Sequence, residues 1–534
     1  MAQKQLLLGD EALALGALHA GLSGVYAYPG TPSTEITEYI QAHPLAKERN
    51  VHSAWSANEK TAMEGALGMS YAGKRSLVCM KHVGMNVCAD PLMGSAMTGA
   101  NGGLVVAACD DPSMHSSQNE QDSRFWGTFG MMPVFEPSSQ QETYLMAREA
   151  FDYSEKRGIP VIMRLTTRMA HSRAVVEPTG DIREQNALHY PEHPRNWVTL
   201  PVNARVRNRQ LIKDYAQFEA DAAESPFNFL RDGKDRSMGI IACGITYNYL
   251  MENYPDGCPF PVLKISQYPF PRTLAQKLAG MVPAILVLEE GQPMVEERLR
   301  GVFPSGTRIL GRIDNTLPRD GELTPDAVRE ALGLPALPAY PASEVVAPRP
   351  PALCQGCGHR DFYTALNNVL KKDYPTARVF SDIGCYTLGY MSPFNAIHTC
   401  VEMGASFTMA QGAAYSGTWP SVGVLGDSTF THSGMTGLLD AVNGNADVVL
   451  CISDNLTTAM TGGQDSAGTG RIEAICAGLG VDPAHIRTIV PLPANYPAME
   501  QVIREEIEYH GVSVIVCRRE CIQTARRHAK AAKA

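Results

Sequence analysis

The segment VLGDSTFTHSGMTGLLDAVNGNADVVLCISDN, residues 424–455, constrains the fold more than any other part of the chain. It reads as an apolar strand, the turn Gly-Asp-Ser, a helix rich in small residues and a second apolar strand that ends in Asp-Asn. This order predicts two parallel strands, whose carboxyl ends meet at one edge of a sheet. Asp427 and Asn455 follow these strands, so we expect both side chains at that edge.

Short β-like runs alternate with helical patterns through most of the 534 residues, which predicts an α/β protein with several doubly wound parallel-sheet domains. Six segments follow from the patterns: an α/β unit, a polar irregular connection, a second α/β unit, a Pro-rich linker, a third α/β unit and a basic tail. In that order they span residues 1–190, 191–235, 236–335, 336–353, 354–524 and 525–534.

The composition excludes several classes of protein. The chain holds 46 Lys and Arg against 55 Asp and Glu, and this net charge of −9 argues against broad nucleic-acid binding. No apolar run approaches the ~20 residues of a membrane span, and the start does not look like a signal peptide, so we expect a cytoplasmic protein away from membranes. The odd count of 13 Cys argues against a disulfide framework and leaves a few thiols as candidate ligands.

The turn after the first strand of 424–455 suits a phosphate and a metal ion. Gly426 allows close approach to the backbone, and Ser428 leads into a helix whose free N–H groups favour an anion. Oxygen ligands from Asp427 and Asn455 fit Mg²⁺, which would clamp a diphosphate. The alternative is an ordinary turn, because Asp and Asn are common where strands end. The spacing and the flanking strands favour the metal site.

This segment resembles the thiamine-diphosphate motif, which begins with Gly-Asp and ends near an Asn about 30 residues later. The resemblance implies Asn455 and the carbonyl of Thr457 as further metal ligands, and Gly404 as a cofactor-binding residue. Ser428 and Asp454 replace the commoner Gly and Asn. Both departures, like the following TGGQDS, are typical of the 2-oxoacid:ferredoxin oxidoreductase family.

The first α/β unit holds a candidate catalytic carboxylate. Glu59 stands at a helix start in WSANEK, and Thr31 lies at a strand-to-helix turn in YPGTPSTEI. Glu59 could simply be a favourable charge at a helix N-terminus. The resemblance implies more: a buried Glu59 that hydrogen-bonds the aminopyrimidine of the cofactor and promotes its imino tautomer, with Thr31 among the catalytic residues. Glu64 is the nearest competitor for this role.

Two polar, glycine-punctuated stretches, 80–93 and 110–127, follow strands in the same unit. Their Asn, His, Gln and Arg residues suggest a substrate site. Arg124 is the candidate for binding the carboxylate of a 2-oxo acid, and His115 the candidate for assisting proton transfer. For each residue the alternative is a surface loop that satisfies its own backbone.

Cysteines open and close the third unit. Cys354 and Cys357 form a C-x-x-C pair, Cys385 lies in SDIGCYTLG, and Cys521 follows the last strand-like run. Spacing alone leaves three interpretations: structural thiols, a zinc site with His359 as third ligand, or a [4Fe–4S] cluster.

The family resemblance favours the cluster. Its members place a cluster beside thiamine diphosphate with a C-x-G-C-G pair, a Gly-Cys element and a Cys near the domain end. The resemblance therefore implies these four cysteines as ligands, with Cys517 competing with Cys521 for the fourth place.

The chain as a whole resembles the thiamine-diphosphate subunit of the indolepyruvate-type 2-oxoacid:ferredoxin oxidoreductases. The supporting stretches are YPGTPSTEI, WSANEK, VGMNVCADPL, DDPSMHSSQNEQDSR, LCQGCGHR, DIGCYTLG and GDSTF. The resemblance implies a pyrimidine-binding domain, then a transketolase-C-terminal-like domain, then a diphosphate-binding domain. It also implies oxidative decarboxylation of an aromatic 2-oxo acid such as indolepyruvate or phenylpyruvate, with coenzyme A taking the acyl group as an arylacetyl-CoA.

The resemblance also implies partners: a smaller β subunit in a heterotetramer or larger assembly, and ferredoxin as electron acceptor. The family's large subunit usually ends in a ferredoxin-like domain with two C-x-x-C-x-x-C runs, and this sequence reaches Ala534 without them. We therefore expect a separate ferredoxin-like subunit or another acceptor. Two rival hypotheses remain: a cluster-free thiamine decarboxylase or carboligase, and a non-catalytic subunit that kept the fold.

Overall fold

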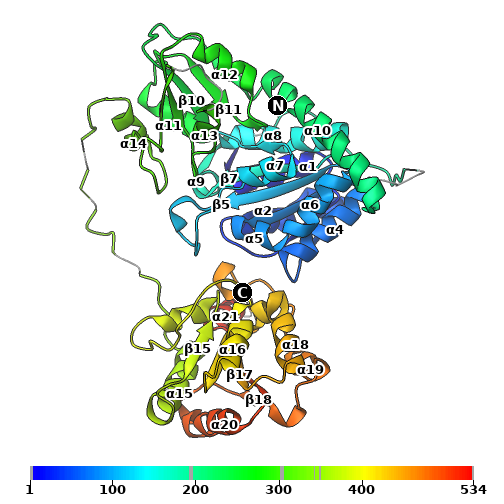
Figure 1. Cartoon of the computed structure of the whole chain (residues 1–534), viewed down its shortest axis with the longest axis vertical. Coiled ribbons are helices and arrows are strands. Elements are labelled where there is room, and N and C mark those ends of the chain that lie inside the picture. Colours follow the sequence, from blue (N-terminus) through cyan, green and yellow to red (C-terminus); the bar gives the residue numbers. More distant parts are fainter. Residues whose placement is uncertain are drawn as a thin grey trace. The chain divides into compact units, whose positions relative to one another are not determined.

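The computed structural model describes residues 4–191, 197–300, 306–338, 340, 341, 343–347 and 350–531. The chain forms two compact units, Met1–Tyr340 and Pro341–Ala534, and each is described by itself (Figure 1). Among the described residues, no helix has both the length and the apolar character needed to cross a membrane.

A sheet of seven strands in the order β12-β6-β7-β5-β4-β2-β3 organises the first part of unit 1. All neighbours in it are parallel except β12 and β6. Every residue of β5 is buried, as expected where helices cover both faces of a parallel sheet. The strands are β2 (Gly24–Ala27), β3 (His52–Trp55), β4 (Ser76–Lys81), β5 (Leu104–Asp110), β6 (Val134–Phe135), β7 (Val161–Thr166) and β12 (Gln267–Tyr268).

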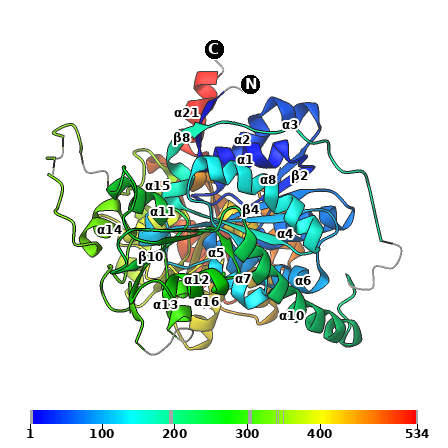
Figure 2. The same ribbon diagram turned by 90° about the horizontal axis from the view of Figure 1, so that it is seen from above.

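Helices cover this sheet, and α1 and α8 lie side by side (Figure 2). Helix α8 shows how local sequence sets the ends of a helix: the side chain of Ser139 caps its start, and Gly158 ends it with a φ of 61°. The helices are α1 (Gly9–His19), α2 (Thr34–Ala42), α3 (Pro44–Glu48), α4 (Glu59–Tyr71), α5 (His82–Val87), α6 (Ala89–Thr98), α7 (Arg124–Gly130), α8 (Gln140–Arg157) and α9 (Thr167–His171). A separate antiparallel pair joins β1 (Gln5–Leu8) to β8 (Arg173–Val176).

The rest of unit 1 is built on a second sheet in the order β14-β13-β10-β11-β9, with β9 antiparallel at its edge. Strand β12 follows β11 directly along the chain but pairs with β6 of the first sheet. This exchange ties both sheets into one unit. The elements are β9 (Phe229–Arg231), β10 (Gly239–Cys243), α11 (Thr246–Asn253), β11 (Val262–Ile265), α12 (Arg272–Ala279), β13 (Ala284–Leu288), α13 (Met294–Leu299), β14 (Arg308–Leu310) and α14 (Pro325–Ala331).

The prediction of an irregular connection over 191–235 is wrong for much of its length. Helix α10 (Pro201–Glu224) occupies 24 of these residues on the outside of unit 1 (Figure 1). Pro201 is at its first turn, where proline is favoured. The buried residues of this helix are Leu211, Phe218 and Ala222. The periodic apolar pattern by which a surface helix is recognised in a sequence is therefore weak here.

Unit 2 contains a five-stranded, all-parallel sheet in the order β15-β16-β17-β19-β18. The strands are β15 (Arg378–Ser381), β16 (Ser421–Gly426), β17 (Val448–Asp454), β18 (Ile486–Ile489) and β19 (Val512–Arg518). The helices are α15 (Gly358–Asp373), α16 (Ala405–Tyr415), α17 (Asp427–Thr429), α18 (Met435–Asn443), α19 (Ile472–Gly478), α20 (Tyr496–Glu508) and α21 (Ile522–Ala531).

The segments predicted at the two ends of unit 2 are a Pro-rich linker and a basic tail. The described residues of the Pro-rich segment 336–353 contain no helix or strand. The predicted basic tail 525–534 is helical as far as it is described, because α21 runs to Ala531, and no residue of that helix is buried.

Candidate functional site

Strands β16 and β17 are parallel neighbours, with Gly426 opposite Ser453 in the register. Asp427 and Asn455 therefore leave the sheet at the same edge, as the spacing of 424–455 predicts. The hydroxyls of Thr458 and Ser428 are 3.0 Å apart and join the two loops that follow these strands. The carboxyl edge of unit 2 is thus the place where the predicted ligands gather.

Asp427 has the environment of a metal ligand. Its side chain is 2% exposed, and no hydrogen bond from the described residues reaches its Oδ2. Burial, together with the charge of the nearby Asp454, raises the pKa of this carboxyl to about 7. A buried carboxylate oxygen without a partner is costly unless a proton or a cation satisfies it. The residue therefore fits a bound Mg²⁺.

Asn455 and Thr457 form the second arm of this edge. The amide N–H of Thr457 donates to Asn455 Oδ1 at 3.2 Å, across Leu456, whose φ is 64°. The hydroxyl of Thr457 donates to the Gln464 carbonyl at 2.9 Å, which anchors the loop. This tight turn holds the Asn455 oxygen and the Thr457 backbone at fixed positions after β17.

Asp454, which replaces the Asn expected at that position, is a structural residue. It is fully buried at the end of β17, and Arg518 Nε donates to its Oδ2 at 2.6 Å. Arg518 also pairs with Glu473 at 2.8 Å. Arg518 compensates the negative charge of Asp454. Asp454 therefore does not need a metal ion as its counter-ion, although its carboxylate acts on the pKa of Asp427.

Gly404 is placed against the loop that follows Asp427. Its φ is 93°, and a Cβ there would lie 2.6 Å from the Cβ of Ser433, so glycine is required for this approach. Asp382, which the sequence analysis missed, accepts from the N–H of Gly404 at 3.2 Å and from the hydroxyl of Ser406 at 2.6 Å. Burial raises its pKa to about 7. The acidic residue after β15 in SDIGCY was its only signal.

The four predicted cluster ligands gather at the same end of unit 2. Cys354, Cys357, Cys385 and Cys521 line one cavity of about 120 Å³. Burial, followed by the charges of the other three, raises the pKa of Cys385 to about 12. Thiolates crowded in this way repel one another, which a positively charged iron–sulfur core would relieve.

This cavity adjoins the Asn455 loop. Asn455 lines it, and the N–H of Cys521 donates to the Asn455 carbonyl at 3.0 Å. The predicted cluster ligand and the predicted metal ligand are therefore joined by one backbone hydrogen bond.

The geometry distinguishes between the alternatives left open for the cysteines. Cys517 lines the same cavity but is buried in β19, and the groups that raise its pKa besides burial are Cys451 and Asp454. Cys521, by contrast, raises the pKa of both Cys357 and Cys385, which favours Cys521 as the fourth ligand. His359 is buried, its pKa falls to about 4, and its Nδ1 lies 3.2 Å from Cys357 Sγ. Ligands on zinc lie about 3.8 Å apart. Within the described residues, no three of these thiols and His359 reach even 4.8 Å of one another, so a preformed zinc site does not fit.

Glu59 in unit 1 is buried, at 5% exposure, as the first residue of α4. It packs so closely on α5 that a Cβ at Gly84 would lie 2.7 Å from both its Cγ and its Oε1. The competing Glu64 is different: its side chain is 46% exposed and pairs with Lys60. Burial thus singles out Glu59 as the carboxylate whose surroundings resemble those of a catalytic residue.

Thr31 lies half-buried in the turn between β2 and α2. The hydroxyl and the N–H of Ser33 both donate to the Gly30 carbonyl, at 2.7 and 2.8 Å, and fix this turn. A Cβ at Gly30 would lie 3.1 Å from the Cβ of Lys81, at the end of β4. Burial lowers the pKa of Lys81 to about 8. Lys81 is therefore a cation beside the Thr31 turn, and the sequence analysis missed it because a single Lys after a strand is unremarkable.

His115 lies in the loop after β5 with its side chain 53% exposed, and its Nε2 is 3.4 Å from Glu322 Oε2. The exposed position leaves its predicted role in proton transfer as a prediction.

The predicted role of Arg124 does not fit its position. The side chain is fully buried and pairs with Asp122 at 2.5 Å and with Glu289 at 2.9 Å. Its Nη2 also donates to the Glu290 carbonyl at 2.9 Å. Glu289 and Glu290 follow β13 of the second sheet, so Arg124 joins the two sheets of unit 1. A substrate carboxylate has no access to it.

Two family models match this chain. Residues 15–223 match the thiamine-diphosphate-binding domain of pyruvate flavodoxin/ferredoxin oxidoreductase, and residues 382–517 match the C-terminal binding domain of thiamine pyrophosphate enzymes. The second match contains Asp427, Asn455 and the cavity residue Cys385.

Curated relatives match over nearly the whole length. The chain is 39% identical to indolepyruvate oxidoreductase subunit IorA of Archaeoglobus fulgidus and 36% identical to that of Methanothermobacter thermautotrophicus. Each match covers 97% of this chain, and 86% and 87% of the respective relative. Among solved structures, 2-oxoglutarate:ferredoxin oxidoreductase from Magnetococcus marinus aligns with a TM-score of 0.50 at 16% identity, over 62% of this chain and 65% of that one, which indicates a shared fold.

Proposed function

The chain belongs to the indolepyruvate oxidoreductase family of thiamine-diphosphate-dependent 2-oxo acid oxidoreductases. From this membership we propose its substrate, the roles of its site residues and the path of the electrons. It acts on an aromatic 2-oxo acid of the indolepyruvate type. One 2-oxo acid and one coenzyme A give one acyl-CoA, one CO₂, one proton and two electrons. The electrons leave through an iron–sulfur cluster to ferredoxin or a ferredoxin-like subunit.

The observation that carries the proposal is the buried Asp427 oxygen that lacks a partner among the described residues, at the same sheet edge as Asn455. We assign Asp427, the side chain of Asn455 and the carbonyl of Thr457 to Mg²⁺ on a diphosphate. Gly426 and Ser428 border the diphosphate, and Gly404 keeps the adjoining loop close. When bound, thiamine diphosphate supplies the nucleophilic carbon and accepts the charge left by CO₂.

Glu59 is assigned to the aminopyrimidine of the cofactor. It is buried at the start of α4, and its carboxyl is the group that hydrogen-bonds a ring nitrogen of the cofactor in this proposal. Thr31 and Lys81 border the substrate in this proposal, with Lys81 replacing Arg124 as the cation for the substrate carboxylate.

Cys354, Cys357, Cys385 and Cys521 hold the proposed [4Fe–4S] cluster. The hydrogen bond from the Cys521 N–H to the Asn455 carbonyl supports this, because a cluster on Cys521 would lie beside the proposed metal loop. The relatives are named as subunits, which supports a partner. We propose a smaller β subunit in a heterotetramer or larger assembly. The cytoplasmic location stays a prediction.

The experiment is Mg²⁺-dependent binding of thiamine diphosphate to the full chain by calorimetry, with wild type, Asp427→Asn and Asp440→Asn. Asp440 is an exposed aspartate on α18 and serves as the matched control. We expect Asp427→Asn to weaken binding by about 100-fold or more and Asp440→Asn to leave it unchanged. Equal binding by all three proteins would contradict the assignment.

A further inference from the structure

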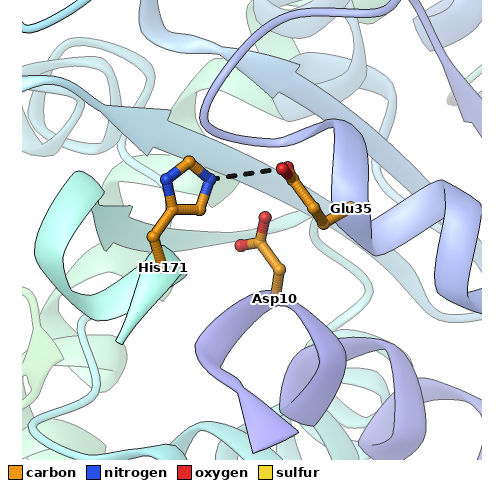
Figure 3. Close-up of side chains that lie close together, drawn as sticks. All are labelled: Asp10, Glu35 and His171. Carbon is orange, nitrogen blue, oxygen red and sulfur yellow. Dashed lines mark ion pairs between the residues drawn. The ribbon is translucent and has the colours of Figure 1, made fainter. Parts of the chain in front are cut away.

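A second group of metal-ligating side chains lies in unit 1, apart from every residue assigned to the reaction. Asp10 of α1, Glu35 of α2 and His171 of α9 each offer one ligand atom, and these atoms all lie within 4.8 Å of one another. Figure 3 shows the Asp10 carboxylate pointing into the gap between the His171 ring and the Glu35 carboxylate. Three separate helices converge on this gap.

Asp10 provides an independent sign that something is bound there. Its side chain is 0% exposed, and no hydrogen bond from the described part of the chain reaches either carboxylate oxygen. Burial, followed by the charges of Glu35 and Glu11, raises its pKa well above the usual range. Glu11 itself is engaged, because it accepts from the Leu8 N–H at 2.8 Å. A buried carboxylate in this state must take up a proton or face a cation.

The neighbours are arranged to complete a cation site. Glu35 Oε2 is itself buried, and His171 Nε2 lies 3.5 Å from it, which is long for a hydrogen bond. The side chains of His171 and Glu35 are 33% and 37% exposed, so an ion has a path in from solvent. Two carboxylates and one neutral imidazole balance the charge of one divalent ion.

We propose that Asp10, Glu35 and His171 bind a divalent first-row transition ion such as Mn²⁺ or Zn²⁺. One nitrogen and two carboxylate oxygens suit these ions better than Mg²⁺ or Ca²⁺, which prefer oxygen ligands throughout. Glu35 is four residues beyond Thr31, and a metal there fixes the start of α2 to α1 and α9. The site is structural and holds the Thr31 turn in place.

The test is Mn²⁺ binding to the full chain without thiamine diphosphate, with free Mn²⁺ measured by electron paramagnetic resonance. Mn²⁺ is used because it prefers carboxylate oxygens to the thiols of unit 2. Asp427→Asn removes the other candidate carboxylate site and serves as the background. Asp10→Asn and Glu35→Gln are then added singly to that background, because both keep the shape of the side chain.

We expect the background protein to bind one Mn²⁺, and each added variant to weaken this binding by about tenfold or more. Mn²⁺ should raise the melting temperature of the background protein and leave that of Asp10→Asn unchanged. Anomalous scattering from Mn²⁺-soaked crystals should place the ion beside Asp10. The proposal is overturned if Asp10→Asn binds Mn²⁺ as tightly as the background. It is also overturned if the background protein binds no Mn²⁺. A higher melting temperature of Asp10→Asn would then identify Asp10 as a buried protonated acid.

Discussion

Arg164 in unit 1 and Asp427 in unit 2 are both buried charged residues, and they are compensated in opposite ways. In unit 1, Arg164 is fully buried, pairs with Asp110 at 2.6 Å and also pairs with Glu136, while neighbouring Arg124 pairs with Asp122 and Glu289. In unit 2, Asp427 is buried with one oxygen unpartnered among the described residues. Paired charges hold two sheets together, whereas an unpaired charge at the carboxyl edge of a sheet marks a place for a ligand.

The largest expected effect comes from breaking the paired network. Arg164→Met leaves Asp110 and Glu136 buried without their cation, which costs about 3–5 kcal/mol of the free energy of unfolding. Denaturant unfolding of the variant measures this cost. Arg209→Ala, on the exposed face of α10, is the control and should change stability by less than about 0.5 kcal/mol. Equal stability of the two variants would mean that the network contributes nothing.

Removing the charge of the unpaired Asp427 should stabilise the fold, whereas removing the paired Arg164 should destabilise it. The pKa of Asp427 is about 7 in the folded chain and lies near 4 in an unfolded one, so ionisation destabilises the fold as pH rises through this window. Without ligands, Asp427→Asn should stabilise the chain by up to about 4 kcal/mol near pH 8 and by about 1.5 kcal/mol at pH 5. Unfolding at both pH values measures the difference. A variant that is less stable than wild type at pH 8 would show that Asp427 is paired after all.

Lys81 of unit 1 is the cation that we propose for the substrate carboxylate. Lys81→Met should raise KM for the 2-oxo acid by about tenfold through loss of a charged contact, which corresponds to about 1.4 kcal/mol. Because burial lowers the pKa of Lys81 to about 8, wild-type KM should also rise above that pH as the ammonium loses its proton, and this rise should be absent in the variant. An unchanged KM with an unchanged pH profile would remove Lys81 from the substrate site.

The smallest expected effect belongs to Glu64, which lies on the same helix as Glu59. Glu64→Gln should change neither the free energy of unfolding nor the turnover measurably, because its partner Lys60 is also exposed. Glu59→Gln should bind thiamine diphosphate and lose most of its turnover. Steady-state kinetics of both variants, at saturating cofactor, distinguishes them. Similar losses in the two would contradict the assignment of Glu59.

The sequence predicts the parts of the site that are local. Asp427 and Asn455 follow neighbouring strands, and a strand–helix–strand pattern is enough to bring them to one edge. The predicted role of Arg124 in binding the substrate carboxylate does not fit its buried position. Its partner Glu289 is 165 positions away, and spacing within a loop carries no information about that partner. The edge strand β12 depends in the same way on a distant partner, β6.

The sequence misses helix α10 and Asp382 for two different reasons. Helix α10 buries only three residues, so its periodicity is faint, and the polar composition of 191–235 favoured an irregular connection. Asp382 follows a short strand and caps α16 through Gly404 and Ser406, which are 22 and 24 residues later. Its importance rests on burial, which no local pattern around it reveals.

The central claim is that one chain joins a thiamine-diphosphate site to an oxidative exit for electrons. The direct measurement is the iron, acid-labile sulfide and thiamine diphosphate content of the chain purified anaerobically with its partner, for wild type and for Cys385→Ser, with Cys400→Ser as control. About four irons and four sulfides per thiamine diphosphate are predicted for wild type and control, with iron lost from Cys385→Ser. Thiamine diphosphate without iron in all three proteins would contradict the claim and indicate a cluster-free decarboxylase.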